Sequence, residues 1–332
     1  MKYFVKEHEY KSSIVIHNFL PEIGIDNARE EILKGLNCSS KYISPKFFYN
    51  REGSDLFDKI TKLEEYYPTR SEKEILSNLI SYLEFDFKNV DIIELGSGNA
   101  SKISLIFNQL STDILQTIDY FAVDIAKSVI EKSIEHITDV YHVSCTGIIT
   151  DFYKNLKVLP GIKRRLFCFF GSTIGNFNPK ETEIFLNQLG ILMKSGDALL
   201  LGADMIKNIS ILELAYNDRK NITEAFNKNI LNNVNMLLKS NFNLDDFEHI
   251  AFYNKDKSRI EMHLKALKDQ KIISRYFSKI IEIKKGEKIH TENSYKFNEN
   301  SLKQFGCLAG LKLENIFFDS QKRFSLSYYL KQ

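Results

Sequence analysis

The sequence has few of the features that mark disulfide-bonded, zinc, nucleic-acid and membrane proteins. Its four cysteines are far apart and form no C-x-x-C pair, so neither a disulfide framework nor a zinc knuckle is expected. The net charge of +2 includes no basic block that would bind DNA or RNA. No apolar run reaches the length of a membrane span, and the first residues are too polar for a secretory signal. We therefore expect a soluble cytoplasmic protein that binds a small molecule, with no nucleic acid, membrane or metal.

The composition is that of an ordinary globular protein. Of 332 residues, 43% are apolar and 27% are charged, which predicts a packed core in one large domain or two ordinary ones. No long apolar helix face requires a partner, so a monomer is expected.

Residues 91–102, DIIELGSGNASK, are the stretch around which the rest is organised. The pattern predicts a buried strand, a turn on Gly96 and Gly98, and the start of a helix. Such a turn lets a ligand approach the main chain. The third glycine of a dinucleotide fingerprint is absent, because Ser101 stands in its place. Together with Glu94 on the strand, this favours S-adenosylmethionine, although such a turn also occurs without a ligand.

Further strands of the same kind follow, and each ends in a polar or glycine-rich segment. The second is predicted to end at Asp124, where a carboxylate can bind ribose hydroxyls or simply cap the next helix. The third strand is followed by Asp151 and Phe152, which could hydrogen-bond to adenine and stack on it. Alternatively, Asp151 is a solvent-facing acid and Phe152 is a core residue. The fourth runs into residues 171–176, and ligands in parallel sheets lie beyond such strand ends. Together these features predict a Rossmann-like α/β domain that binds an adenosyl cofactor.

The remaining segments predict a second domain. Residues 207–290 read as two helices followed by antiparallel strands, and residues 301–330 return to the sheet as a helix and a hairpin. An aromatic-rich segment, residues 44–76, contains Tyr66 and Tyr67 where Pro68 is expected to interrupt helix. We therefore assign 71–206 plus 297–332 to the cofactor domain. We assign 1–70 plus 207–296 to an inserted α+β substrate domain.

The sequence contains several distinctive strings: KFFYNREGSDLFDKIT, EEYYPTRSEKEIL, ELGSGNASK, FFGSTIGNF, AYND with ITEAFNKNIL, RIEMHL and TENSYKF. Together they resemble the histidine-specific methyltransferases of ergothioneine biosynthesis. The resemblance implies a class I S-adenosylmethionine-dependent methyltransferase sheet. It also implies conversion of L-histidine to its Nα-trimethyl betaine, hercynine, as the first step of ergothioneine biosynthesis. The chain departs from the family at Phe47 and Glu64, where tryptophan and proline are common, which predicts altered packing or hinge behaviour.

The resemblance also implies roles for individual residues. Those matching cofactor contacts are Tyr66, Gly96, Lys102, Asp124, Asp151 and Phe152. Those matching substrate contacts are Tyr49, Phe57, Tyr66, Gly171, Asn176, Tyr216, Met262, Glu292 and Ser294. Of these, Tyr49, Asn176 and Tyr216 hold the amine and carboxylate where the reaction occurs, while Glu292 and Ser294 read the imidazole beside Met262.

A glutamate and a hydroxyl can satisfy both nitrogens of an imidazole ring, and a site with buried polar groups rejects a ring that cannot satisfy them. Taken singly, Met262 is more typical of a core residue and Glu292 of a solvated charge. The main alternative is a member of the same family that acts on another amino acid, such as tryptophan or a derivative. The sequence lacks the N-P-P-Y-type motif expected of a methyltransferase that acts on amino groups of nucleic acid. A protein that binds the cofactor as a sensor without catalysing a reaction is a further alternative, which the motifs do not exclude.

Overall fold

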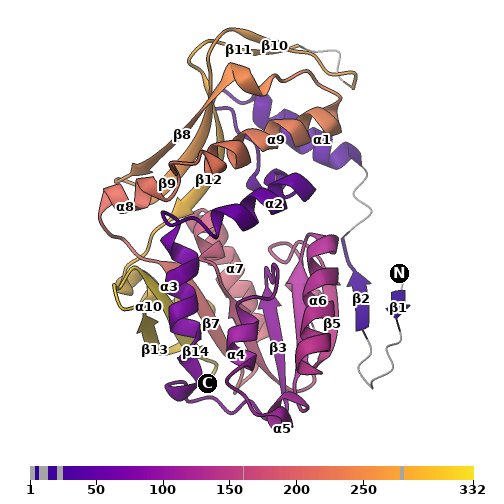
Figure 1. Cartoon of the computed structure of the whole chain (residues 1–332), viewed down its shortest axis with the longest axis vertical. Helices are drawn as coiled ribbons and strands as arrows, with labels where there is room; N and C mark the ends of the chain where they lie inside the picture. Colours follow the sequence, from indigo (N-terminus) through magenta and orange to yellow (C-terminus); the bar gives the residue numbers. More distant parts are fainter. Residues whose placement is uncertain (1–3, 7–13, 21–24, 160, 277–279) are drawn as a thin grey trace. The chain divides into compact units, whose positions relative to one another are not determined.

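The computed structural model describes residues 4–6, 14–20, 25–159, 161–276 and 280–332. The chain divides into two compact units, which are described separately (Figure 1). Unit 1 comprises Met1–Pro21, Arg70–Ile206 and Phe297–Gln332, and unit 2 comprises Glu22–Thr69 and Lys207–Lys296.

Unit 1 contains a mixed sheet in which the described strands have the order β1-β2-β5-β4-β3-β6-β7-β14-β13. The neighbours from β2 to β7 are parallel, whereas β1, β14 and β13 pair antiparallel. The bounds are β1 (Phe4–Lys6), β2 (Ile14–Asn18), β3 (Val90–Leu95), β4 (Asp119–Asp124), β5 (Ser144–Ile149), β6 (Arg164–Phe169), β7 (Ala198–Asp204), β13 (Lys312–Phe318) and β14 (Phe324–Leu330). The chain passes from β3 outward to β4 and β5, and then returns to β6 and β7 on the other side. This reversal is the topological switch point of a doubly wound sheet, and it confirms the predicted Rossmann-like fold.

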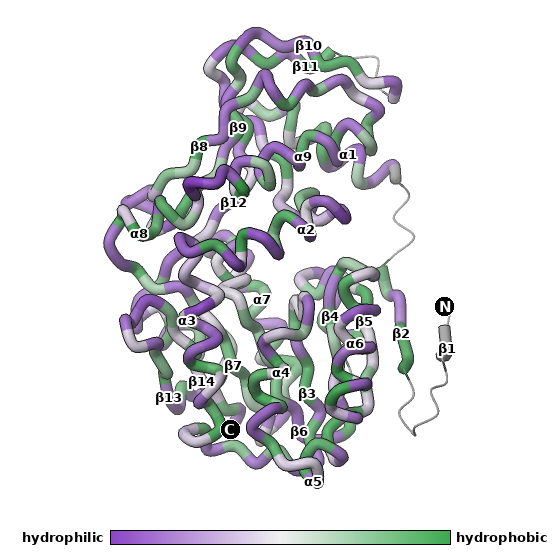
Figure 2. Tube along the Cα trace, in the orientation of Figure 1, coloured by the Kyte–Doolittle hydropathy of each residue, from purple (hydrophilic) through white to green (hydrophobic). Residues whose placement is uncertain are grey.

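The central strands are apolar because helices cover them. Every residue of β3 and β7 is buried, and Figure 2 shows the hydrophobic colour along much of these strands, with Asp91, Glu94 and Asp204 as hydrophilic exceptions. Buried parallel strands read as continuous apolar runs, which explains why the sequence located them. The helices of unit 1 are α4 (Ile103–Phe107), α5 (Thr112–Leu115), α6 (Lys127–Tyr141), α7 (Pro179–Leu192), α10 (Glu299–Ala309) and most of α3 (Tyr67–Leu76).

The first residues of the chain differ from expectation. We assigned all of 1–70 to the substrate domain, but β1 and β2 extend the sheet of unit 1. Strand β2 pairs in parallel with β5, from Ile14 beside Cys145 to Asn18 beside Ile149. A pairing between segments more than a hundred residues apart leaves no local pattern in a five-residue strand, so the sequence did not reveal it.

Unit 2 combines helices with an antiparallel sheet of order β12-β9-β8 and a separate β10-β11 pair. Helix α9 packs against α1, α2 and the strands β8 and β9, and its apolar residues join the core of the unit. The bounds are α1 (Ile25–Asn37), α2 (Arg51–Ile60), α8 (Ile209–Leu214), α9 (Ile222–Leu238), β8 (Phe247–Asn254), β9 (Arg259–Ala266), β10 (Gln270–Ile272), β11 (Ile281–Ile283) and β12 (Lys288–Tyr295). Among the described helices, none is long and apolar enough to cross a membrane.

Candidate active site

The glycine turn of unit 1 lies directly after β3, at the switch point of the sheet. Gly96 and Gly98 have φ angles of +71° and +54°, a region that side chains other than glycine rarely adopt. The N–H of Gly96 donates to the Val123 carbonyl at 2.8 Å, which ties the turn to β4. A Cβ atom added at Gly98 would meet nothing within 4 Å. The turn is therefore open to a ligand on that side.

Asp124 is the last residue of β4 and lies against this turn. Its carboxylate accepts hydrogen bonds from the N–H groups of Gly98 at 3.3 Å and Ala126 at 3.0 Å. Burial raises the pKa of Asp124, and these N–H groups oppose the rise. Helix α6 begins at Lys127 with no side-chain cap, so the helix-cap alternative for Asp124 was wrong.

Asp151 and Phe152 follow β5, at the same edge of the sheet. Phe152 comes within 4.0 Å of the place where a Gly96 Cβ would stand. Its ring packs edge-on against Phe169 and Phe185, with centroids 5.7 Å and 6.1 Å away. Asp151 is half-buried and forms an ion pair with Lys154 at 3.5 Å. The structure thus brings Phe152 to the glycine turn, while Asp151 has a local partner.

Lys102 and Gly171 meet through a buried acid that the sequence did not single out. Glu72 on α3 accepts from the N–H of Gly171 at 2.7 Å and pairs with the Lys102 ammonium at 2.9 Å. Asn176 ends the short 3₁₀ helix η4 (Thr173–Asn176) after Gly171, and its side-chain amide has no hydrogen-bond partner among the described residues. The contact between Glu72 and Gly171 joins residues 99 positions apart, which explains why no local signal marked it.

Glu94 lies beneath the turn and is 1% exposed. It accepts a hydrogen bond from the Tyr120 hydroxyl at 2.7 Å. Burial raises the pKa of Glu94 to about 8, so the group is largely protonated at neutral pH. The open turn, the acid at the end of β4 and the Phe152 ring together fit an adenosyl group.

The predicted aromatic residues of unit 2 form a continuous series of ring contacts. Tyr49 meets Phe57 edge-on at 6.1 Å, Phe57 meets Tyr66 at 6.4 Å, and Tyr66 meets Tyr216 at 6.4 Å. Phe226 of α9 also contacts two of these rings, Tyr49 and Phe57. Four residues predicted from distant segments are therefore neighbours.

The prediction that Pro68 stops helix at Tyr67 was wrong. Tyr67 is the first residue of α3 and is 2% exposed, because proline is tolerated in the first turn of a helix, where no N–H is needed. Only Tyr66 precedes the helix.

Tyr216 leads to the residues predicted to read imidazole. Its hydroxyl donates to the Ser294 hydroxyl at 2.8 Å. Ser294 and Glu292 alternate along β12 and therefore share one face of the strand. Met262 is the cross-strand neighbour of Glu292 on β9, which places both side chains on the same face.

Glu292 is not the solvated charge that its sequence suggests when taken alone. The residue is 8% exposed, and no described residue donates a hydrogen bond to its carboxylate. Burial raises the pKa of Glu292 to about 7, while the positive charge of Lys296 opposes the rise. A buried carboxylate without a donor is costly unless a ligand supplies one. Met262 is 2% exposed and belongs to the apolar core, so its core interpretation also holds.

Lys296 is a member of this group that the sequence reasoning missed. It is 3% exposed and donates to Ser294 at 2.7 Å and to Tyr216 at 3.2 Å. The alternation Glu292, Ser294, Lys296 was a readable signal, because every second residue of a strand lies on one face.

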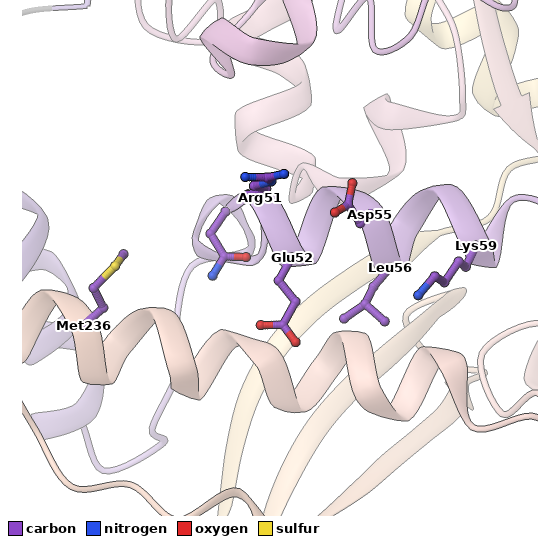
Figure 3. Close-up of a pocket in the computed structure, with 7 residues that line it drawn as sticks. Arg51, Glu52, Asp55, Leu56, Lys59 and Met236 are labelled. Atoms are coloured by element: carbon purple, nitrogen blue, oxygen red, sulfur yellow. The ribbon is translucent and has the colours of Figure 1, made fainter.

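A hollow on the surface of unit 2 is lined by a different set of residues (Figure 3). Its lining comes from α2 and α9 and their flanks: Asn50, Arg51, Glu52, Asp55, Leu56, Lys59 and Met236. Figure 3 shows Glu52 and Leu56 pointing from α2 toward the neighbouring helix. None of the predicted site residues lines it.

Comparison with known proteins provides independent information. Residues 28–331 match the model of the family described as histidine-specific methyltransferase, SAM-dependent. The chain is 36% identical over 301 residues to the histidine N-alpha-methyltransferase of Mycolicibacterium smegmatis, covering 90% of this chain and 93% of that protein. It is also 36% identical over 305 residues to the protein of that name from Mycobacterium tuberculosis, covering 91% and 94%. Ergothioneine biosynthesis protein 1 of Neurospora crassa is 29% identical over 272 residues, covering 80% of this chain and 30% of that protein.

Proposed function

This chain belongs to the histidine-specific, S-adenosylmethionine-dependent methyltransferase family, and we propose that it methylates the α-amino nitrogen of L-histidine. Three rounds of transfer would yield Nα,Nα,Nα-trimethyl-L-histidine (hercynine), the first step of ergothioneine biosynthesis. The chain is thus an S-adenosylmethionine-dependent methyltransferase, and the identity of its amino acid substrate is the proposal.

The observation that carries this substrate is the Glu292 carboxylate. It is buried, has no hydrogen-bond donor among the described residues, and lies two residues from the Ser294 hydroxyl on the same strand face. A neutral imidazole ring can satisfy both groups, because its N–H donates to the carboxylate and its unprotonated nitrogen accepts from the hydroxyl. A phenyl ring would satisfy neither and would leave the carboxylate buried without a partner, which is strongly unfavourable.

We assign the cofactor to unit 1. Gly96 and Gly98 would let its methionine part approach the main chain, and Asp124 would accept from the ribose hydroxyls. Phe152 would pack on the adenine. The Lys102 ammonium, which pairs with Glu72, would bind the carboxylate of the cofactor's methionine part. Asp151 is assigned to the adenine by family resemblance, with its ion pair to Lys154 as a competitor. S-adenosylmethionine supplies, when bound, an electrophilic methyl group on a positively charged sulfur.

The chain's own residues would orient the substrate amine and carboxylate. Tyr49 is 37% exposed, and its hydroxyl is proposed to accept a hydrogen bond from the amine and align the nitrogen lone pair. Tyr216 is proposed to bind the substrate carboxylate, and family resemblance assigns the same role to Asn176. The amine must be neutral to act as a nucleophile, and an α-amino group has a pKa of about 8, so a small shift is sufficient. Most of the acceleration would come from orientation.

One experiment tests this proposal. The purified chain is incubated with S-adenosylmethionine and a mixture of the common amino acids, and products are identified by mass spectrometry. We expect histidine to gain one, two and three methyl groups, with phenylalanine unchanged. Methylation of tryptophan in place of histidine, or of no amino acid, would refute the proposed substrate.

A further inference from the structure

The Lys296 ammonium is an additional functional group at the proposed imidazole site. Lys296 directly follows β12, on the strand face that carries Glu292 and Ser294. It is 3% exposed. Its Nζ donates to Ser294 Oγ at 2.7 Å and to the Tyr216 hydroxyl at 3.2 Å, and it lies 5.1 Å from the centre of the Tyr216 ring. The resemblance to known methyltransferases assigned no role to this residue.

The ammonium determines how the two hydroxyl groups can hydrogen-bond. An ammonium group only donates, so both hydroxyl oxygens accept from Lys296. The Tyr216 hydroxyl donates to Ser294 Oγ at 2.8 Å, which fills both acceptor positions of Ser294. The Ser294 hydrogen then remains for a ligand. Lys296 therefore occupies an acceptor position on Ser294 that a ligand could otherwise use, so Ser294 meets a ligand as a donor.

The same ammonium acts on the neighbouring carboxylate by its charge. The positive charge of Lys296 favours the ionised form of Glu292, against the effect of burial. An ionised carboxylate only accepts hydrogen bonds, whereas a protonated one also donates. Lys296 therefore favours a site in which the Glu292 carboxylate is a hydrogen-bond acceptor and the neighbouring hydroxyl is a donor.

We propose that Lys296 is a positioning residue for substrate selectivity, because it makes the Ser294–Tyr216 pair a donor and Glu292 an acceptor, the pattern that complements a neutral imidazole. This inference rests on the proposed function. It deepens that function by naming the residue that determines which hydrogen-bonding pattern the site accepts.

The test uses the variant Lys296→Met, which keeps the length of the side chain and removes its charge and donors. We expect the KM for histidine to rise about 10- to 100-fold, as for loss of hydrogen bonds to a charged group, with a smaller change in kcat. The preference for histidine over phenylalanine and glutamine should fall. Lys296→Arg should recover part of the KM. Lys288→Met, an exposed lysine on the same strand, is the matched control and should behave like the unaltered chain.

A double-mutant cycle separates this role from general support of the fold. In a Glu292→Gln/Ser294→Ala background, Lys296→Met should raise the KM by less than about twofold, because the groups it acts through are already changed. Calorimetry should give unaltered affinity for S-adenosylmethionine in every variant. An undiminished effect in that background, or an unchanged KM in Lys296→Met alone, would overturn the inference. Absence of histidine turnover by the unaltered chain would instead overturn the proposed function.

Discussion

Glu94 of unit 1 and Glu292 of unit 2 are both buried glutamates at a candidate site, and they differ in what surrounds them. Glu94 in unit 1 is 1% exposed and accepts from Tyr120 at 2.7 Å, whereas Glu292 in unit 2 is 8% exposed and has no donor among the described residues. Burial raises both pKa values, to about 8 and about 7. Glu94 is therefore hydrogen-bonded within its own unit, while Glu292 has no donor among the described residues, as the proposed imidazole contact requires.

The same difference extends to the surrounding residues. In unit 1, main-chain groups hold the candidate residues in place, since the N–H groups of Gly98 and Ala126 bind Asp124. In unit 2, side chains hold one another, as Ser294, Tyr216 and Lys296 do. Changes in unit 1 should therefore alter cofactor affinity and stability, whereas changes in unit 2 should alter which substrate is selected.

The largest expected effect is that of Glu94→Gln on the pH dependence of stability. Folded Glu94 keeps its proton up to about pH 8, but in the unfolded chain it ionises near its ordinary pKa of 4.5. Unfolding between these values releases a proton, so the free energy of unfolding falls as pH rises through this window. The variant should remove a fall on the order of 3 kcal/mol between pH 5 and pH 8, measured by urea denaturation.

Two further variants sharpen this result. Glu292→Gln should remove a smaller part of the fall, because the pKa of Glu292 rises only to about 7. Glu131→Gln, in a surface ion pair of α6, should leave the pH dependence unchanged. An unaltered pH dependence in Glu94→Gln would contradict the assignment of a buried, protonated carboxyl.

Asp124→Ala should have the next largest effect, on cofactor binding. The change removes the proposed ribose acceptor and also the hydrogen bonds to Gly98 and Ala126, so affinity for S-adenosylmethionine should fall about 100-fold by calorimetry. The control is Asp119→Ala, at the opposite end of β4, where the carboxylate pairs with Lys163 at 2.7 Å. Equal affinity in Asp124→Ala and the unaltered chain would reject the ribose assignment.

In unit 2, Glu292→Ala combined with Met262→Val should change selectivity. The double variant removes the acceptor and enlarges the space beside it, so the preference for histidine should fall roughly 10- to 50-fold and larger aromatic amino acids should be accepted. Competition assays between histidine and a larger aromatic amino acid measure this preference. Affinity for S-adenosylmethionine should be unchanged, and Glu282→Ala on β11 is an exposed control. Unaltered selectivity would argue against imidazole reading by these side chains.

The smallest expected effect is that of Tyr49→Phe. The ring contacts with Phe57 and Phe226 are kept, and only the hydroxyl proposed to orient the amine is lost. One net hydrogen bond corresponds to a decrease in kcat of about 2- to 10-fold, measured by steady-state kinetics at saturating histidine. Tyr82→Phe, a 68% exposed tyrosine, is the control. A decrease equal to that of the control would exclude this role for Tyr49.

The sequence predicted the sheet well because its signals are local. The apolar run before Gly96, the acid after the second strand and the terminal hairpin all lie within short windows. It failed where partners are far apart, as in the pairing of β2 with β5 and the contact of Glu72 with Gly171. Residue roles in the second unit came from family resemblance, since Met262 has no distinguishing local pattern and the alternation of Glu292, Ser294 and Lys296 was not used.

Periodicity and turn chemistry alone therefore predicted parallel strands and a glycine turn suited to an adenosyl cofactor, since both depend on residues adjacent in sequence. Only the tertiary structure decided that Tyr49, Phe57, Tyr66 and Tyr216 form one row of rings. It also decided that Lys296 lies against Ser294, near a Glu292 carboxylate to which no described residue donates. Burial and hydrogen bonding depend on segments that meet only when the chain folds, so no window of sequence contains them.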